Sequence, residues 1–149
     1  MSSKNLGSRS RPDSQLTSMA GEFLTVGKLF KRGYQASVTF GNAKGIDLLV
    51  YNPLTDKTFN VQVKTLRHEN GFPLKKENIK SEHIYIFIFL HDFSDPEEFF
   101  IITGHEILND VNKFYGSSYK DSSNPSKVPC INYGPLNEHK DNWQVFDEA

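Results

Sequence analysis

A small set of polar side chains on otherwise apolar segments carries the chemical interest of this sequence. Asp47 interrupts the apolar run 45–50, where a buried carboxylate is costly unless it is paired or binds a metal. Gln62 and Lys64 stand two residues apart in an alternating segment, so a strand there places both on one face. Glu22 lies in a segment with helical periodicity. The set combines carboxylates, an amide oxygen and an ammonium group.

This combination of groups indicates metal-assisted phosphodiester chemistry. Oxygen donors suit Mg²⁺, which binds through one or two carboxylates, waters and substrate phosphates. A lysine beside the ion can orient or activate water, or neutralise charge at the phosphate being cleaved. Plain structural interpretations remain open beside this one: Asp47 as a solvated residue at a strand entrance, and Glu22 as a surface glutamate. Gln62 and Lys64 equally fit the solvated face of an amphipathic strand.

The elements that must position these residues follow from hydrophobic periodicity. A helix is expected from about Ser14 to Arg32, capped by Asp13 or Ser14 and stopped by Gly33. Its expected apolar face consists of Leu16, Met19, Ala20, Phe23, Val26, Gly27 and Phe30. Strands are expected at 34–40, 45–51, 58–66, 83–90 and 99–103, a short helix within 73–82 and a longer one over 105–115.

The turn at 52–56 should join the second and third strands into a hairpin. In such a hairpin Asp47 can lie beside Gln62 and Lys64 on one face of the sheet. The mixture of hairpins and helices predicts an α/β domain with a mixed sheet rather than repeated βαβ units. A last apolar cluster, at residues 143–146, is expected to anchor the polar C-terminal segment.

In order and spacing, these residues resemble the PD-(D/E)xK, or restriction-endonuclease-like, nucleases. That superfamily has a glutamate in the first helix, an aspartate on the second strand and a (D/E/Q)xK motif on the third. The corresponding segments here are 21–23, 45–48 and 61–65, and the resemblance spans roughly Ser14 to Leu90. The expected order α-β-β-β-α-β matches the superfamily core. The glutamine variant is similar to that of Mrr-like nucleases, and Ile46 stands where the motif has proline.

The resemblance implies a restriction-endonuclease-like core with a mixed central sheet flanked by helices. It also implies a Mg²⁺-dependent endonuclease, with Mn²⁺ as a substitute ion, that hydrolyses DNA in restriction, repair or mobile-element processing. Asp47 would be the principal metal ligand, and Gln62, Glu22 and the backbone carbonyl of Val63 would be further ligands. Lys64 would assist the attacking water. Because Gln62 is neutral, a catalytically inactive module of the same fold, binding nucleic acid or protein, is the alternative.

Charge and composition add only local support for a nucleic-acid partner. The formal net charge of the 149 residues is -1, which does not by itself indicate a nucleic-acid binder. A basic track for phosphates would need Arg67, Lys75, Lys76 and Lys28 on the face of the site. The alternative is a solvated loop for the first three and, for Lys28, a helix end that complements the dipole.

The rest of the sequence bounds the organisation of the protein. Residues 1–13 are expected to be a flexible arm before a single domain over 14–149. The single cysteine, Cys130, fits a reducing cytoplasmic setting and excludes a cysteine zinc cluster. The longest apolar run, Ile84–Leu90, is far shorter than the roughly 20 residues that span a bilayer, so no membrane association is expected. Cutting both strands of a duplex would be easiest for a homodimer.

Overall fold

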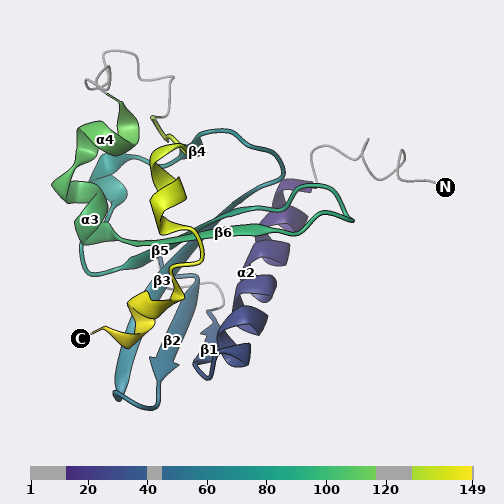
Figure 1. Cartoon of the computed structure of the whole chain (residues 1–149), viewed down its shortest axis with the longest axis vertical. Coiled ribbons are helices and arrows are strands. Elements are labelled where there is room, and N and C mark those ends of the chain that lie inside the picture. The colour runs from purple at the N-terminus through teal and green to yellow at the C-terminus, as the bar shows by residue number, and fades with distance from the viewer. Residues whose placement is uncertain (1–12, 40–44, 117–128, 149) are drawn as a thin grey trace.

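The computed structural model describes residues 13–39, 45–116 and 129–148 as a mixed α/β fold (Figure 1). The α-helices are α2 (Asp13–Lys31), α3 (Gly104–Asn109) and α4 (Val111–Tyr115), and the 3-10 helices are η1 (Lys76–Asn78), η2 (Pro135–His139) and η3 (Trp143–Asp147). The strands are β1 (Gln35–Val38), β2 (Leu48–Asn52), β3 (Lys57–Leu66), β4 (Phe72–Pro73), β5 (Ile84–Phe89), β6 (Glu98–Thr103) and β7 (Cys130–Ile131). The fold class expected from the sequence is confirmed.

The central sheet has five strands in the order β1-β2-β3-β5-β6, and β4 and β7 form a separate small sheet. The expected hairpin of β2 and β3 is confirmed, with Leu48 opposite Val61. β3 and β5 are parallel, whereas the other neighbouring pairs of the central sheet are antiparallel. The parallel pair requires a crossover, and residues 67–83 supply it. This crossover passes through β4 and η1 rather than the expected short α-helix.

The crossover does not form the expected α-helix because of the spacing of its apolar residues. Leu74 and Ile79 are its buried aliphatic residues, and they stand five positions apart. That separation does not place both on one stripe of an α-helix, where contacts recur at three and four positions. A single 3-10 turn lets each side chain reach the core independently.

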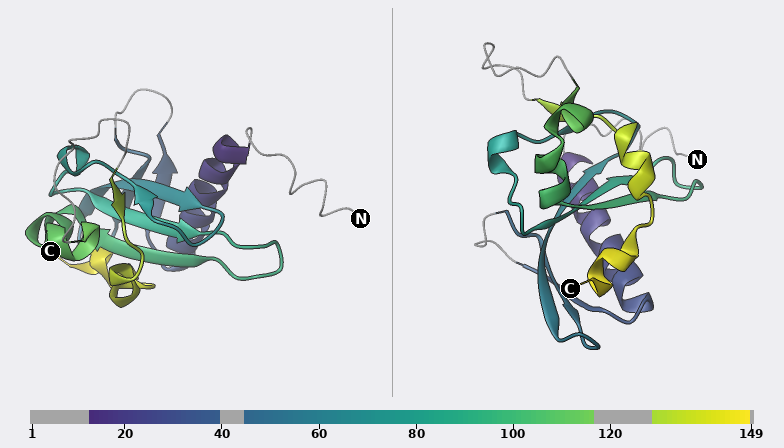
Figure 2. Two further views of the ribbon diagram at one scale, coloured as in Figure 1. Left: turned by 90° about the horizontal axis from the view of Figure 1, so that it is seen from above. Right: turned by 60° about the vertical axis from the view of Figure 1, so that its left-hand side comes forward.

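Two hydrophobic cores lie on opposite faces of the central sheet, and β5 contributes to both because its six residues are all buried. Its isoleucines lie in one core with residues of α2 and η3, and its aromatic residues lie in the other with residues of α3 and α4. The right-hand view of Figure 2 shows these two groups of helices on opposite sides of the sheet. The expected single helix over 105–115 is interrupted at Asp110, which has φ -146° and ψ 62°, so that α3 and α4 bury Ile107 and Phe114 separately. The expected helical region is therefore confirmed, but as two short helices.

The buried face of α2 differs from the expected one. Leu16, Phe23 and Phe30 are each 54% exposed, whereas the buried positions are Thr17, Gly21, Thr25 and Leu29. These four positions recur every fourth residue and most carry small side chains, so the helix can approach β3 closely. A Cβ built on Gly21 would lie 1.9 Å from Thr65 Oγ1, which shows how tight this contact is. The large apolar residues were expected inside, but close packing favoured the small ones.

The segment after β7 completes the core beneath α2. Trp143, Val145 and Phe146 are buried there, as the sequence predicted for this cluster. The side-chain amide of Asn52 donates to the carbonyl of Phe146 at 2.8 Å, and the Tyr34 hydroxyl donates to Asp147 at 2.8 Å. These bonds tie residues 146 and 147 to β2 and to the connection between α2 and β1.

The boundaries of the arm and of the first strands are only partly described. α2 begins at Asp13, and residues 1–12, where a flexible arm is expected, lie outside the described residues, as does Phe40 at the expected end of the first strand. None of the helices in the described part of the chain has the length and apolar character needed to cross a membrane.

Candidate active site on the free edge of β3

The second half of β3 has an open edge where β2 stops. β2 pairs with β3 only as far as Leu48 opposite Val61, so the residues from Gln62 to Leu66 have no β2 partner. Their opposite edge is paired with β5 over the same length. Along this edge the backbone groups of β3 are therefore not paired with β2.

Asp47 stands at the beginning of that edge, immediately before β2. Its backbone N–H donates to the Val61 carbonyl at 2.8 Å, and its carboxylate Oδ2 accepts from the Val63 N–H at 2.8 Å. The N–H and the C=O of a strand residue point to the same side, so the carbonyl of Val63 also faces the Asp47 edge. One carboxylate and one backbone carbonyl are thus brought together, as the resemblance implied for these two residues.

Glu22 approaches the same edge from α2. It lies beside the buried position Gly21 and is half-buried, so the close packing of α2 on β3 determines its position. Burial raises the pKa of the Glu22 carboxyl, and the nearby negative charge of Asp47 raises it further. The two carboxylates therefore share one local environment, which a bound cation would stabilise.

A cavity of about 350 Å³ lies at this edge and collects most of the predicted site. Its lining includes Glu22, Asp47, Val63 and Lys64, and it is completed by Ser18, Thr65, Leu66, Phe72 and Pro73. Three of the four residues predicted to be catalytic therefore meet in one hollow, together with the predicted backbone ligand. Ser18 was not predicted, although it stands four positions before Glu22 and so shares its side of the helix.

Gln62 is the predicted residue that does not line this cavity. It is buried, and its amide nitrogen lies 3.2 Å from Nδ1 of His83 and donates to the Tyr85 hydroxyl at 3.1 Å. Strand alternation places it on the same face of β3 as Lys64. No sequence pattern indicated its two partners, because they come from β5 and its approach, about twenty residues further along the chain.

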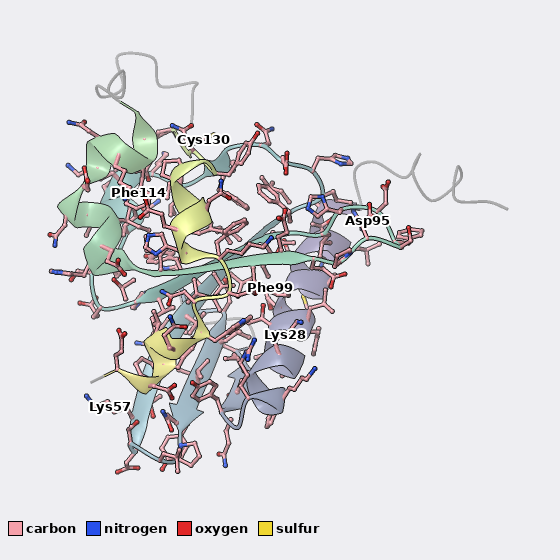
Figure 3. All side chains as sticks on the ribbon, viewed as in Figure 1. Lys28, Lys57, Asp95, Phe99, Phe114 and Cys130 are labelled. Carbon is pink, nitrogen blue, oxygen red and sulfur yellow. The ribbon has the colours of Figure 1, made fainter. Side chains whose placement is uncertain are left out.

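The predicted basic residues do not form one continuous surface with the cavity. Arg67 directly follows the lining residue Leu66, and Lys75 and Lys76 are exposed just after the lining residue Pro73. Lys28 lies elsewhere: its ammonium stands over the Phe99 ring of β6, 5.5 Å from the centroid (Figure 3). Since β6 is the edge strand furthest from β1 and β2, Lys28 is not at this site.

The donor set at the cavity fits a hard divalent cation. Two carboxylates and a strand carbonyl are oxygen donors, the class that Mg²⁺ and Mn²⁺ prefer. The raised pKa of Glu22 points the same way, since burial and the nearby charge of Asp47 both disfavour the ionised Glu22 carboxylate until a positive charge is present. On this structure, Asp47, Glu22 and the carbonyl of Val63 are the groups that would hold such an ion.

A second group of ionisable residues lies after the ends of β3 and β5 and at the start of β6. Ligand atoms of Glu69, His91 and Glu98 lie within 4.8 Å of one another. Both oxygens of Glu98 are already engaged, Oε1 with His91 Nε2 at 2.8 Å and Oε2 with the Lys140 ammonium at 2.9 Å. Because a lysine ammonium already neutralises the central carboxylate, we interpret this cluster as an ion-pair network.

This network predicts a pH dependence of stability. Hydrogen bonds from His91 and then Lys140 lower the pKa of Glu98 below its ordinary value. A carboxylate with a lowered folded-state pKa stabilises the protein above its unfolded pKa, and this contribution is lost as the pH falls through the folded pKa. Urea unfolding of wild type and Glu98→Gln should therefore differ at neutral pH and converge in acid. A difference that stays constant with pH would contradict this account.

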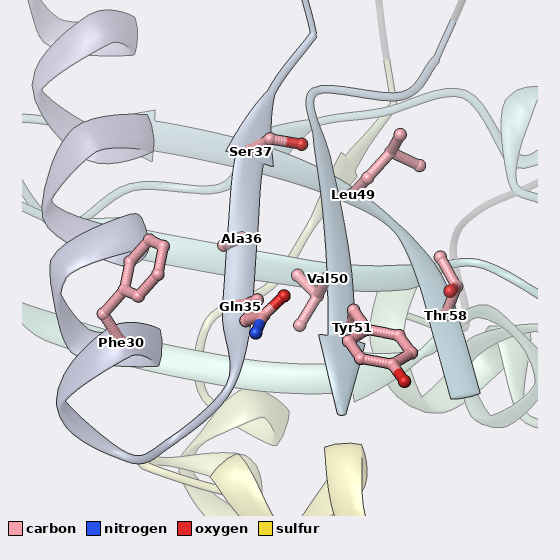
Figure 4. A pocket seen from close by; sticks show the side chains of 8 residues that line it. All are labelled: Phe30, Gln35, Ala36, Ser37, Leu49, Val50, Tyr51 and Thr58. Atoms are coloured by element: carbon pink, nitrogen blue, oxygen red, sulfur yellow. The ribbon is translucent and has the colours of Figure 1, made fainter. Parts of the chain in front are cut away.

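Another hollow lies at the opposite end of α2, where the exposed Phe30 stands beside β1 and β2 (Figure 4). Its lining is mostly apolar or uncharged: Phe30, Gln35, Ala36, Ser37, Leu49, Val50, Tyr51 and Thr58. The Tyr51 hydroxyl, its one titratable group, donates to Asp56 at 2.7 Å. This hollow lacks the acids, bases and cations that hydrolysis requires.

Known proteins resemble this chain in fold but not in sequence. No protein-family model matches the chain, and no curated protein matches it in sequence. The solved structure of a bacterial homing endonuclease, I-Ssp6803I, matches with a TM-score of 0.55 over 89% of this chain and 91% of that chain. The identity is 12%, so the likeness is one of architecture. The chain thus has a fold that is also found in a nuclease.

Proposed function

We propose that the protein is a metal-dependent endonuclease that hydrolyses phosphodiester bonds of DNA. The observation that carries the proposal is the convergence of Glu22, Asp47, the Val63 carbonyl and Lys64 around one cavity at the open edge of β3. The fold shared with a homing endonuclease supports DNA as the substrate class. The PD-(D/E)xK-like order of the residues supports Mg²⁺, or Mn²⁺ in its place, as the cofactor.

Each residue has a part that follows from its chemistry. Asp47 and Glu22 would hold the cation through carboxylate oxygens, and the Val63 N–H fixes the Asp47 carboxylate by occupying Oδ2. Mg²⁺, when bound, would supply Lewis-acid polarisation of the phosphate and a lowered pKa for a bound water. Lys64 would position the attacking water and stabilise the negative charge that develops at the phosphate. Arg67, Lys75 and Lys76 would contact flanking phosphates.

The alternative is a nuclease fold without catalysis that binds nucleic acid or protein. The neutral side chain of Gln62, at a position where many related motifs carry an acid, favours it. Such a module would bind nucleic acid or protein without cutting DNA. Cleavage assays therefore separate the two functions directly.

The test is cleavage of plasmid, single-stranded and branched DNA with Mg²⁺ or Mn²⁺, comparing wild type with Lys64→Ala. We expect cleavage by wild type and a loss of roughly 100-fold or more in the variant, the size seen when one group that stabilises developing charge is removed. Lys57→Ala, at the opposite end of β3 from the cavity, is the matched control and should cut normally. Cleavage that survives Lys64→Ala would show that the active centre lies elsewhere. DNA binding without cleavage would favour the inactive module.

A further inference from the structure

One side of α2 carries three large apolar side chains that the described part of the chain leaves half uncovered. Leu16, Phe23 and Phe30, each 54% exposed, stand seven positions apart, which is close to two helical turns. They therefore form one line along the helix, the α2 stripe. Phe23 is two positions from both Gly21 and Thr25 of the buried face, so it points away from the sheet. Figure 1 shows α2 at the margin of the fold.

The apolar area around the α2 stripe is close to what an interface requires. An aromatic side chain has roughly 150–250 Å² of surface, so 54% exposure leaves about 100 Å² on each phenylalanine. Leu16, together with Leu49 in the hollow that Phe30 also lines, brings the total to roughly 300–400 Å². A standard interface buries about 800 Å² on each partner, and somewhat more than half of that is non-polar. The stripe and the hollow thus supply most of the apolar area for one side of a stable dimer.

A second copy of this chain fits the α2 stripe because the stripe is complementary to itself. If two α2 helices pack antiparallel about a two-fold axis at Phe23, the two Phe23 rings meet. Leu16 of each copy then lies opposite Phe30 of the other copy. The hollow of about 350 Å³ beside Phe30 has room for the smaller leucine side chain (Figure 4). A contact of this kind uses the same surface on both copies and closes after two of them.

The charges of α2 favour the antiparallel direction. Lys28 and Lys31 lie in its last turn, Arg32 follows directly, and all three are exposed. A parallel pair would bring these cationic ends of both copies to the same end of the dimer, where they repel one another. In the antiparallel pair each cationic end lies at the level of residues 14–16 of the other copy, which carry no charge. The two helix dipoles then also oppose each other.

We propose that the protein forms a homodimer in which the α2 stripes of two copies pack against each other antiparallel. This dimer does not depend on the proposed function. It accounts for the distribution of side chains on α2: the small residues of one face contact the sheet, and the large residues of the other face contact the second copy.

The dimer would also place both candidate active sites on one side. The two-fold axis of an antiparallel helix pair is perpendicular to the plane of the two helices, so side chains that project sideways from both helices point the same way. Glu22 precedes Phe23 by one position and so projects about 100° away from the contact. The open edges of β3 in both copies would therefore face the same side, where one ligand could reach both.

The mass in solution tests whether the dimer forms. Sedimentation velocity should give twice the 17.0 kDa of the chain for wild type, with a monomer appearing on dilution. Phe23→Glu should raise the dimer dissociation constant at least about 100-fold, because both copies lose a central aromatic contact. Its circular dichroism spectrum should stay native, since the residue points away from the core. Leu54→Glu replaces another exposed apolar residue, in the turn between β2 and β3, and should remain a dimer. A monomeric wild type at high concentration, or an unweakened Phe23→Glu dimer, would overturn the proposal.

Cysteine cross-linking tests the direction of packing, with Cys130→Ser removing the native thiol. Phe23→Cys should form a disulfide with its own copy under mild oxidation. Phe30→Cys alone should not, because the two copies of residue 30 lie about 21 Å apart along the helix axis, too far for a disulfide. A mixture of Leu16→Cys with Phe30→Cys should cross-link. Efficient cross-linking of Phe30→Cys to itself would show a parallel pair and overturn the proposed arrangement.

Discussion

Asp47→Asn is expected to abolish cleavage while leaving the protein folded. The substitution removes the charge of the proposed central ligand, and a catalytic metal contributes several kcal/mol, so the loss should be roughly 100- to 1,000-fold or more. An asparagine oxygen can still accept the Val63 N–H, which is the bond that the carboxylate makes in the fold. The measurements are initial rates of DNA cleavage with saturating Mn²⁺, and the midpoint of thermal unfolding.

A matched substitution separates the role of Asp47 from a general effect of charge. Asp56→Asn changes an exposed turn residue with φ 62°, a conformation that asparagine tolerates. It should leave both rate and stability close to those of wild type. If Asp47→Asn retained full activity, or if it lost activity only because it unfolded, the assignment of Asp47 as the central ligand would be wrong.

Gly21→Ala is expected to weaken both stability and cleavage, because it forces α2 away from β3. A Cβ at this position would lie 2.9 Å from Thr65 Cβ and closer still to its Oγ1. Overpacking of this kind costs roughly 1–3 kcal/mol. It outweighs the roughly 0.5–1 kcal/mol that alanine gains over glycine inside a helix. The displaced helix would carry Glu22 with it, so cleavage should fall more than the remaining folded fraction accounts for.

The same helix supplies the control. Gly27 is exposed, and a Cβ there meets no atom within 4 Å. Gly27→Ala should therefore stabilise the protein by roughly 0.5–1 kcal/mol and leave cleavage unchanged. Adding Thr65→Ala to Gly21→Ala removes the closest clashing atom, an oxygen that is buried without a hydrogen-bond partner in the described structure. This second change should restore part of the stability. Equal behaviour of the two glycine variants would disprove the close contact.

Much of the fold could be predicted because local periodicity and tertiary packing agree. The strand from Lys57 to Leu66 alternates along its length, and the strand from Ile84 to Phe89 is a continuous apolar run that is buried on both faces. The face of α2 could not be predicted in this way. Its large residues suggest the core by size alone, whereas the contact with Thr65 selects Gly21 and its small neighbours, and that contact is between segments far apart in the sequence.

The candidate site could likewise be predicted where it depends on local strand pairing, but not where it depends on tertiary packing. Asp47 and Lys64 were predicted together because a hairpin fixes which strand residues become neighbours. Their meeting with Glu22 depends on helix packing, which one sequence does not determine. The partners of Gln62 could not be predicted, since they depend on the parallel pairing of β3 with β5 across a crossover. Lys28 was grouped with the site on charge, but its ammonium lies over an aromatic ring of β6.

Trp143, Val145 and Phe146 join the core beneath α2 only after the other residues of that core have been synthesised. When the ribosome has made only the residues up to α4, the sheet strands and α2 are present, but the apolar surface that η3 covers is still open to water. The partner bonds of Asn52 and Tyr34 are also missing at that stage. The nascent protein would therefore expose an apolar surface until η3 emerges. Translation that stops early should yield a product that needs chaperones and is quickly degraded.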